Sequence, residues 1–467
     1  MTIIQKDNIE WFIDNPAFAD FIQTISFGDI LKRSHLKYIF QSERIFIKAF
    51  YEKGLYGLIR NKVVSRGEKE YTLGKRLMAL SIPVPEPLGY GIAKQHSYVI
   101  QRWIEADSLL TLFKSSKNKE VLLTLLASFL KKLASASIRH NDLHLDNILV
   151  KDGILYLVDL HQMKIKKLFN RTDEISNLTH ALAMVYDGIK EKEKELFFNA
   201  YGAPDLRGHV EDNIQRLKRR WIRKKKKRAF DETSRIHLSG DYVYLTGYED
   251  YGKGEPVEVI KDDRKVRVER YTDHIRKYYK SKRRLERAWK NHVVLSYMNY
   301  SLGPQAFYVY RPPFPEYGYI AMEDLKSHGE EMDRYLHRQY GQRIIPERKL
   351  LIERLARFFH SMFQKNIIHK DCKGCNIFVC EGMQFRLLDI EDVAFREIDE
   401  ERLIKMLVQL NTTIPRSVGF NDRMRFFLRL TSIMTIDRKK IFSQVIKRSL
   451  RQVIVYEGTQ GLTREYW

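Results

Sequence analysis

The segment at residues 138–161, IRHNDLHLDNILVKDGILYLVDLH, decides the fold of this chain, because it recurs at residues 367–391 as IIHKDCKGCNIFVCEGMQFRLLDIE. Both copies read H-x-D-x-x-x-x-N, followed by an apolar run, a turn, a second apolar run and an aspartate. The polar landmarks of the second copy lie 229 or 230 positions after those of the first. A repeat held in such constant register predicts two units of the same kind in tandem.

Length and composition bound what these units can be. The chain has 467 residues, of which 44% are hydrophobic, and this suffices for more than one folded domain and excludes wholesale disorder. Its formal net charge of +23 predicts an anionic partner, such as an acidic membrane surface, a phosphate-rich ligand or a nucleic acid. Its three cysteines, all between Cys372 and Cys380, cannot build a disulfide framework and suit a reducing cytoplasm.

The chain carries no sequence signal for insertion into a membrane. Its longest apolar stretch, at residues 121–130, is far shorter than the roughly 18 to 20 residues needed to span a bilayer. The first residues, MTIIQKDNIEWF, lack the basic and then apolar pattern of a signal peptide. We therefore expect a cytoplasmic protein whose contact with the inner membrane is peripheral.

The order of elements around the repeat predicts the architecture. A mostly helical stretch precedes each copy, at residues 109–137 and 346–366, and a strand-rich stretch precedes each helical one. This order predicts an α+β fold in which a small β-rich lobe comes before a larger α-helical lobe, twice. The basic run at residues 216–228 separates the two halves, so we predict one domain at residues 1–229 and a second at residues 230–467.

The polar residues of the first copy have the types and the spacing that phosphoryl transfer requires. That reaction needs a divalent metal against the phosphates, a carboxylate near the attacking hydroxyl and a cation on the nucleotide phosphates. Asp142 has the position of the catalytic carboxylate, which would orient the acceptor hydroxyl. Asn147, at the end of the same loop, and Asp159, after two predicted strands, are the predicted metal ligands.

The part of the chain before the first copy supplies candidates for nucleotide binding. The segment RIFIKAF, residues 44–50, alternates like a strand and places Lys48 where it would reach the nucleotide phosphates. Glu70 begins an amphipathic run that predicts a helix, and its carboxylate is the expected partner of Lys48. Residues 97–108 suit the hinge between two lobes, and Gln101 in this stretch is a further candidate for nucleotide binding.

Together these motifs resemble the lipopolysaccharide kinase family, which includes the core heptose kinases and the Kdo kinases. The resemblance rests on HNDLHLDNILV, YLVDLH, IFIKAF and EYTLGKRLMALSIPVPEPLG, and it covers almost all of residues 30–200. It implies a protein-kinase-like fold, ATP and Mg²⁺ as cofactors, and as acceptor a hydroxyl of Kdo or heptose in the lipopolysaccharide core or on a lipid A-linked sugar. The sequence has no glycine in the D-F-G position and no A-P-E segment, which argues against a phosphorylation-regulated protein kinase.

The second copy retains the catalytic and metal positions. Asp371 matches the catalytic aspartate, and Asn376 and Asp389 match the metal ligands. The loop HKDCKGCN resembles the cysteine-containing catalytic loop of the heptose kinases. Its C-x-x-C spacing does not predict zinc, because the chain has no second cysteine pair to complete four ligands.

The nucleotide-binding half of the second copy matches less well. The strand RVERY places Glu269 where a lysine is expected, and Ala288 stands in place of the helix carboxylate. The nearby residues that could substitute are Lys261, Lys265 and Glu286. Two interpretations stay open: an active second kinase, or a degenerate unit that binds substrate, nucleotide or the first domain.

Four histidines near the motifs are not predicted to act in catalysis or in metal binding. His140 and His369 are expected to hydrogen-bond the backbone and to shape the catalytic loop. His144 and His161 have no comparable position and are expected to be ordinary polar residues.

Two basic runs, at residues 216–228 and 276–290, predict engagement of an anionic membrane or glycolipid, with Trp221 and Ile222 inserting shallowly. No recognised nucleic-acid-binding module accompanies this charge, so we expect no nucleic-acid partner. The competing functions are a kinase of another small molecule, such as an aminoglycoside, a kinase of a protein, and a non-catalytic binding or scaffold protein.

Overall fold

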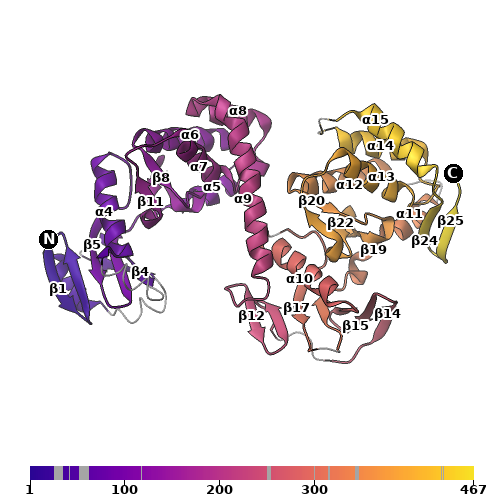
Figure 1. Ribbon diagram of the computed structural model, residues 1–467, viewed down its shortest axis with the longest axis horizontal. Helices are drawn as coiled ribbons and strands as arrows, with labels where there is room; N and C mark the ends of the chain where they lie inside the picture. The colour runs from indigo at the N-terminus through magenta and orange to yellow at the C-terminus, as the bar shows by residue number, and fades with distance from the viewer. Residues whose placement is uncertain are drawn as a thin grey trace. The chain divides into compact units, whose positions relative to one another are not determined.

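The structure is a computed structural model that describes residues 1–25, 35–40, 43–51, 63–116, 118–249, 254–298, 300–313, 316–341, 347–432, 434 and 436–467. Its internal contacts divide the chain into two compact units, Met1–Lys218 and Arg219–Trp467 (Figure 1). The division falls inside helix α9 (Arg207–Lys227), slightly before the boundary that the sequence predicts after residue 229. Across the described ranges, no helix combines the length and the apolar character that crossing a bilayer requires.

The first unit begins with a six-stranded antiparallel sheet in the order β1-β2-β5-β6-β4-β3. The strands are β1 (Thr2–Lys6), β2 (Ile9–Ile13), β3 (His35–Phe40), β4 (Glu43–Tyr51), β5 (Pro87–Ile92) and β6 (His96–Arg102), and helix α1 (Phe18–Thr24) follows β2. Successive side chains of a strand point to opposite faces, so β4 buries Ile45 and Ile47 completely and turns Lys48 to the other face.

Helix α4 (Arg66–Ala79) packs on this sheet. Ser65 caps its start, because the serine hydroxyl accepts a hydrogen bond of 3.1 Å from a backbone N–H of the first turn. Gly67 permits a close contact with β6, since a Cβ at that position would lie 2.2 Å from the carbonyl oxygen of Tyr98. The cap and the glycine thus set the depth at which the helix holds Glu70, whose side chain is only 2% exposed.

The helical lobe of the first unit follows the sheet. Its helices are α5 (Leu109–Ser115), α6 (Lys119–Ser135), α7 (Arg171–Leu182), α8 (Glu191–Tyr201) and α9. Its short strands are β7 (Asp107–Ser108), β8 (Ile138–His140), β9 (Ile148–Lys151), β10 (Ile154–Leu157) and β11 (Met163–Ile165). Leu126, Leu130 and Leu133 recur at helical spacing along α6 and are buried in the core of this lobe. Strand β8 pairs with β11 and β9 with β10, so both ends of the motif at residues 138–161 are fixed to that core.

The second unit has the same order of lobes. Its seven-stranded antiparallel sheet runs β12-β13-β17-β18-β16-β15-β14. The strands are β12 (Ile236–Ser239), β13 (Tyr242–Leu245), β14 (Glu258–Asp262), β15 (Val266–Arg270), β16 (Ile275–Tyr279), β17 (Ala306–Tyr310) and β18 (Tyr319–Met322). Helix α10 (Lys282–Tyr297) packs on this sheet through the fully buried Trp289, whose indole N–H donates to the carbonyl oxygen of Ala229 at 2.8 Å.

The helical lobe of the second unit contains α11 (Met332–Tyr340), α12 (Arg348–Gln364), α13 (Glu400–Asn411), α14 (Phe420–Thr431) and α15 (Arg438–Ser449). Its strands are β19 (Gly329–Glu331), β20 (Ile367–His369), β21 (Ile377–Cys380), β22 (Gln384–Leu387), β23 (Val393–Phe395), and the hairpin of β24 (Ile454–Gly458) and β25 (Gly461–Glu465). The predicted α+β class, with a β-rich lobe before an α-helical lobe, is confirmed in each unit.

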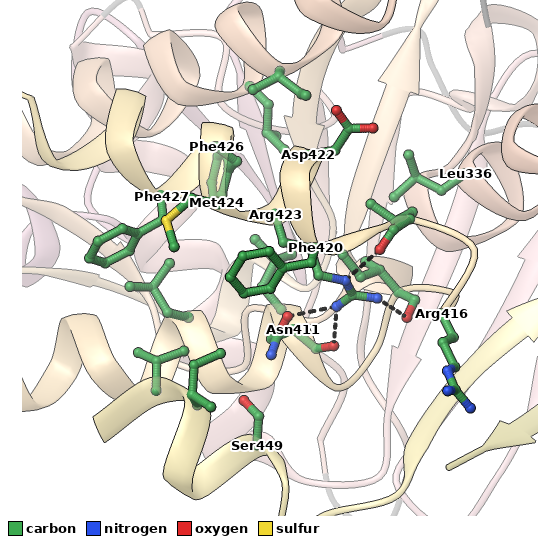
Figure 2. Close-up of a pocket in the computed structure, with 18 of the residues that line it drawn as sticks. Leu336, Asn411, Arg416, Phe420, Asp422, Arg423, Met424, Phe426, Phe427 and Ser449 are labelled. Carbon is green, nitrogen blue, oxygen red and sulfur yellow. Dashed lines mark hydrogen bonds between the residues drawn. The ribbon is translucent and has the colours of Figure 1, made fainter. Parts of the chain in front are cut away.

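An apolar cavity of about 470 Å³ lies among the helices of this second lobe (Figure 2). Arg423 of α14 stands beside it and donates hydrogen bonds of 2.7 Å to the carbonyl oxygens of Asn411, Val418 and Pro415. Burial lowers the pKa of Arg423 to about 10, so the guanidinium stays charged at neutral pH. These bonds hold the loop between α13 and α14 in place and satisfy a cation that is largely withdrawn from water.

Candidate active site

Three elements of the first unit bring Lys48, Glu70 and Asp159 together. Lys48 projects from β4 and Glu70 from α4, while Asp159 follows β10. The Nζ atom of Lys48 lies 2.5 Å from Oδ1 of Asp159 and 3.4 Å from Oε2 of Glu70. The lysine and the aspartate are each 25% exposed, so this cluster opens to solvent on one side. The predicted meeting of these three residues is confirmed.

Asp159 has an unusual backbone conformation, with φ 63° and ψ 46° in the left-handed region. Few non-glycine residues adopt it, and such outliers concentrate at functional sites. Asp389 of the second unit has nearly the same conformation, with φ 52° and ψ 54°. Because the outlier occurs in both units, it belongs to the site and is not an accident of one turn.

The loop that carries Asp142 is held by its own neighbours. The side-chain amide of Asn147 donates to the carbonyl oxygen of Asp142 at 2.9 Å, and the N–H of Asp142 donates to Nδ1 of His140 at 3.1 Å. Burial lowers the pKa of His140 to about 4, despite the carboxylates of Asp159 and Asp142 nearby, so its ring is neutral and can accept that bond. The Asp142 carboxylate itself is 54% exposed and accessible to an acceptor.

Both histidines that precede the candidate catalytic aspartates bond the backbone, as predicted. In the second unit, Nε2 of His369 lies 3.1 Å from the carbonyl oxygen of Leu388 and 3.2 Å from that of Asp389. His369 therefore fixes the strand end from which Asp389 projects.

The donor atoms at this site fit a divalent metal such as Mg²⁺. The amide nitrogen of Asn147 is bonded to the loop backbone, which leaves its oxygen available as a ligand. Asp159 uses Oδ1 for Lys48, and no hydrogen bond to its Oδ2 occurs within the described part of the chain. Carboxylate and amide oxygens are the ligands that Mg²⁺ prefers. Asn147 and Asp159 are thus the residues that would hold the metal.

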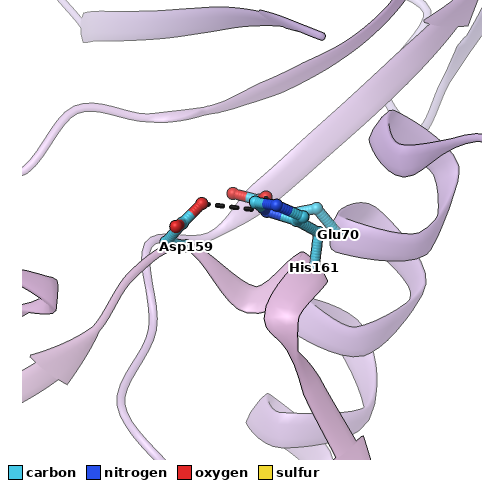
Figure 3. Close-up of side chains that lie close together, drawn as sticks. All are labelled: Glu70, Asp159 and His161. Carbon is cyan, nitrogen blue, oxygen red and sulfur yellow. Dashed lines mark ion pairs between the residues drawn. The ribbon is translucent and has the colours of Figure 1, made fainter. Parts of the chain in front are cut away.

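His161 joins this cluster, although the sequence predicts only an ordinary polar residue there (Figure 3). Its Nδ1 lies 2.9 Å from Oδ1 of Asp159 and 3.3 Å from Oε2 of Glu70. Burial alone would lower the pKa of His161, but attraction to Asp159 and Glu70 outweighs it and the pKa is raised. Burial would likewise raise the pKa of Asp159, yet His161 and Lys48 hold it well below its usual range. Asp159 is therefore ionised at neutral pH.

The lysine of the second unit is Lys277 on β16, and not a residue of the RVERY strand. Its Nζ lies 2.5 Å from Oδ1 of Asp389. The strand order explains this. In the first sheet Lys48 lies on β4, the neighbour of β6, and in the second sheet the strand in the same place is β16, the neighbour of β18. Glu269 lies one strand farther out, on β15, and pairs with Arg267 at 2.6 Å. The prediction that Glu269 replaces the lysine is wrong.

The acid that pairs with this lysine also has a different origin. Glu391 is 1% exposed, and its Oε1 lies 3.0 Å from Nζ of Lys277 and 3.1 Å from Nη2 of Arg284. In the first unit the helix contributes Glu70 and the turn after the aspartate contributes His161. In the second unit the helix contributes Arg284 and the turn contributes Glu391, so the acid and the base have exchanged elements.

The residues suggested as substitutes in the second unit do not take these places. Ala288 is fully buried in α10. Lys261 pairs with Asp263 at 3.2 Å, and Glu286 pairs with Lys290 at 3.1 Å. Lys265 is an exposed residue of the turn between β14 and β15.

Lys277 remains charged in this pocket. Burial alone would lower its pKa, but Tyr279, Glu391 and Asp389 together raise it. The pKa of Asp389 is lowered, because Lys277 outweighs the opposing effect of burial. The pair therefore has the protonation states that binding a metal-bound triphosphate would require.

The second catalytic loop is arranged like the first. The side-chain amide of Asn376 donates to the carbonyl oxygen of Asp371 at 2.8 Å. The Asp371 carboxylate accepts from Gln409 at 3.2 Å and lies 3.0 Å from Nζ of Lys373. Lys373 has the position of His144 in the first unit, so the second unit has a fixed positive charge beside its candidate catalytic aspartate.

Neutralising Glu391 is expected to destabilise the second unit by about 3 kcal/mol, because Glu391→Gln leaves the buried Lys277 and the partly exposed Arg284 with one carboxylate fewer. Hydrogen exchange of peptides from the two units would report each stability separately. Glu397→Gln removes an exposed carboxylate six residues later and should cost less than about 0.5 kcal/mol. Equal exchange in the Glu391→Gln and Glu397→Gln variants would contradict the structural role of Glu391.

Gln101 lies on β6 and does not join the Lys48 cluster. Its backbone is opposite Phe46 on β4 and Pro87 on β5. Val99, two residues earlier, is opposite Lys48, so Gln101 points to the same side of the sheet as Val99. Its predicted contact with a nucleotide stays a prediction.

The basic runs are less uniform than the sequence suggests. Arg276 and Lys277 are 9% and 8% exposed, so the run at residues 276–290 is not one solvated surface. The ring of Trp221 packs edge-on against Tyr297 at a centroid distance of 6.4 Å. Trp221 thus packs partly on its own unit, and its shallow insertion into a membrane stays a prediction.

Comparison with known proteins adds a family to this geometry. Residues 43–172 match the family model for the RIO domain, an atypical protein kinase-like family. The matched part contains β4, α4, the catalytic loop and Asp159, and it is less than half of the chain. No curated protein sequence matches the chain.

The solved structures that are similar to the chain include two at 14% sequence identity. The first is WaaP in complex with acyl carrier protein, with a TM-score of 0.35, covering 44% of this chain and 98% of that one. The second is WbdD in a co-crystal with the kinase inhibitor LY294002, with a TM-score of 0.29, covering 46% of this chain and 48% of that one. The chain therefore spans about half the length of WbdD. The RIO-domain match and the arrangement of Lys48, Glu70 and Asp159 identify the first unit as a kinase domain, as the sequence predicts.

Proposed function

We propose that this chain is an ATP-dependent phosphotransferase that phosphorylates a hydroxyl of Kdo or heptose in the inner core of lipopolysaccharide. The observation that carries the proposal is the meeting of Lys48, Glu70 and Asp159 next to the Asp142 loop. Lys48 would neutralise the nucleotide phosphates, Asp159 and Asn147 would hold Mg²⁺, and Asp142 would orient the acceptor hydroxyl. Bound Mg²⁺ would supply neutralisation of the triphosphate charge.

Sequence motifs and charge support the acceptor class. The motifs HNDLHLDNILV and IFIKAF resemble those of the lipopolysaccharide kinases. The net charge of +23 suits a phosphate-bearing glycolipid in an anionic leaflet, where each nearby Lys or Arg contributes about 1 kcal/mol. We propose that the enzyme works as a peripheral protein at the cytoplasmic face of the inner membrane.

We also propose that the second unit has a phosphotransfer site of its own. Lys277 pairs with Asp389, and the side chain of Asn376 bonds the backbone of Asp371. These contacts support the presence of the lysine, the metal ligands and the acceptor-orienting aspartate in the second unit. Lys373 adds a cation beside Asp371 that would favour the negative charge of a phosphoryl group in transfer. The support for a degenerate second unit was the joint absence of the lysine and of the helix carboxylate. Lys277 supplies the lysine, and Glu391, from the turn after Asp389, supplies a second acid.

The test is to incubate the full chain with ATP, Mg²⁺ and core glycolipid that lacks phosphate, and to locate the added mass by fragmentation mass spectrometry. Wild type, Asp142→Ala, Asp371→Ala and the double variant are compared. We expect each single variant to lose phosphate from one position of the core and the double variant to lose both.

Other outcomes have definite meanings. Normal transfer by Asp142→Ala would overturn the assignment of the first site. Transfer unaffected by Asp371→Ala would make the second unit a non-catalytic partner. Phosphorylation of an aminoglycoside or of a protein, with none on the core glycolipid, would replace the proposed acceptor.

A further inference from the structure

The end of helix α9 and the chain that follows it line a small, partly open cavity in the second unit, of about 200 Å³. Three cations and three hydroxyl groups line it: Lys224, Lys225, Arg228, Thr233, Ser234 and Tyr297. Each of these side chains can donate a hydrogen bond, and none of them is a carboxylate. The carboxylate of Asp231 lies 3.8 Å from Nε of Arg228, so three cations and one nearby carboxylate leave the cavity with a net positive charge that suits an anion.

The cations around this cavity are close enough to oppose one another's charge. The Nζ atom of Lys225 lies 3.4 Å from the centre of the Tyr297 ring and 5.6 Å from that of Trp221. Burial lowers the pKa of Lys225, and the neighbouring cations Arg228 and Arg235 lower it further. A bound anion would relieve this repulsion and restore the ordinary affinity of the lysine for its proton.

The wall that carries the hydroxyl groups is fixed by packing. The hydroxyl groups of Thr233 and Tyr297 are 3.2 Å apart. Arg235 donates to the carbonyl oxygen of Ser296 at 3.2 Å, and its guanidinium lies 5.0 Å from the centre of the Tyr297 ring. Trp221 also packs against the Tyr297 ring, so Tyr297 is held in place before any ligand arrives. Donors that are already ordered cost little conformational entropy on binding.

The opposite side of the same helix end is also positive. Lys226 lies 4.7 Å from the centre of the Phe395 ring. Burial lowers the pKa of Lys226 to about 8, and Lys370, Lys290 and Arg287 contribute to the decrease. Positive charge on two sides of α9 raises the local concentration of anions around the cavity.

We infer that this cavity binds a dianionic phosphate group and is separate from the two proposed triphosphate sites. Lys224, Lys225 and Arg228 supply the charge, and the three hydroxyl groups supply directional hydrogen bonds. A volume of about 200 Å³ is room for several water molecules, each of which takes about 30 Å³ in the liquid, and so for one phosphate with part of its carrier. The inference concerns binding alone and does not depend on the proposed kinase activity.

Calorimetric titration of the full chain with inorganic phosphate and with pyrophosphate, without ATP or metal, tests the site. Sulfate and chloride at matched ionic strength serve as controls, since screening alone would otherwise change the result. The double variant Lys224→Gln/Arg228→Gln is expected to bind phosphate at least about tenfold more weakly, which corresponds to about 1.4 kcal/mol.

A matched control lies on the same helix turn. Arg223 and Lys227 are exposed and do not line the cavity, so Arg223→Gln/Lys227→Gln removes the same charge from α9. This control should change the affinity less than about twofold, because its two charges do not line the cavity and act on the anion only through screened, longer-range attraction. Thr233→Val removes one hydroxyl with no change in charge and should weaken binding about threefold, as the loss of one hydrogen bond does.

Vesicles distinguish the source of the phosphate group. Phosphatidic acid carries a phosphate monoester, whereas phosphatidylglycerol at the same surface charge carries a diester. Preference for phosphatidic acid, lost in Lys224→Gln/Arg228→Gln, would identify a lipid-borne ligand, and binding of inorganic phosphate without that preference would identify a soluble one. Equal phosphate affinity in wild type and in this variant, or an equal loss in the matched control, would overturn the site while leaving the kinase assay unaffected.

Discussion

Replacing Asp142 by asparagine is expected to lower phosphoryl transfer by the first unit about 10²- to 10⁴-fold, the range for a positioned general base. The loop should keep its shape, because Asn147 and His140 bond only the backbone of residue 142. The KM for ATP should change little, since Asp142 is predicted to act on the acceptor and not on the nucleotide. The measurement is the initial rate of phosphate transfer in an Asp371→Asn background, which removes the proposed contribution of the second unit.

Asp146→Asn is the matched control for this prediction. Asp146 is exposed, lies in the same loop and accepts a hydrogen bond of 3.1 Å from Ser108. The Asp146→Asn variant loses the same charge as Asp142→Asn. Its rate should nevertheless stay within about twofold of wild type, because Asp146 is a surface residue outside the cluster around Lys48. An Asp142→Asn enzyme that keeps more than about a tenth of the rate would contradict the catalytic assignment.

Asp159→Asn is expected to lower the same rate at least about 10²-fold, the effect of losing one fixed electrostatic group, and to raise the concentration of Mg²⁺ required. Asparagine tolerates the left-handed conformation that residue 159 adopts, so the backbone should stay in place. The variant loses the charge that faces Lys48 at 2.5 Å and an anionic ligand for the metal. Initial rates measured over a range of Mg²⁺ concentrations would show both effects.

A control for backbone and charge together is Asp152→Asn. Asp152 also has a positive φ, of 51°, and it lies exposed in the turn between β9 and β10. Its replacement should leave both the rate and the Mg²⁺ requirement unchanged. If Asp159→Asn behaved in the same way, the metal would have to be held elsewhere.

The sequence predicts the first site well because each part of it has a local signature. Asp142 and Asn147 share one loop, and five positions separate them whatever the rest of the chain does. Lys48 and Glu70 lie in a strand and a helix whose periodicities are clear, so their faces could be predicted. Lys48 lies in the β-rich lobe and Asp159 in the helical lobe that follows it, and a kinase-like arrangement of the two lobes predicts that these residues face each other.

The second site was harder because strand neighbours cannot be read from periodicity. RVERY and IRKYY both alternate and both contain cations, yet only β16 lies beside β18. Over the residues that the structure describes, the second sheet has one more strand at this edge, β14, than the first sheet. An alignment that counts strands along the chain therefore places the lysine on β15, one strand too early. His161 and Glu391 were missed for a related reason, since their importance depends on a helix residue distant in sequence. The change from D-L-H to D-I-E between the copies was the available signal.

The exchange of acid and base between the two units has a consequence for control. In the first unit one of the two acids that face Lys48 is Glu70 on α4, so a shift of α4 away from the sheet would leave the lysine with Asp159 alone. In the second unit both acids that hold Lys277 come from one short turn, Asp389 to Glu391, so the same movement of α10 would leave them in place. Displacement of the helix would thus change the set of acids that face the lysine in the first unit and leave the corresponding set in the second unit unchanged.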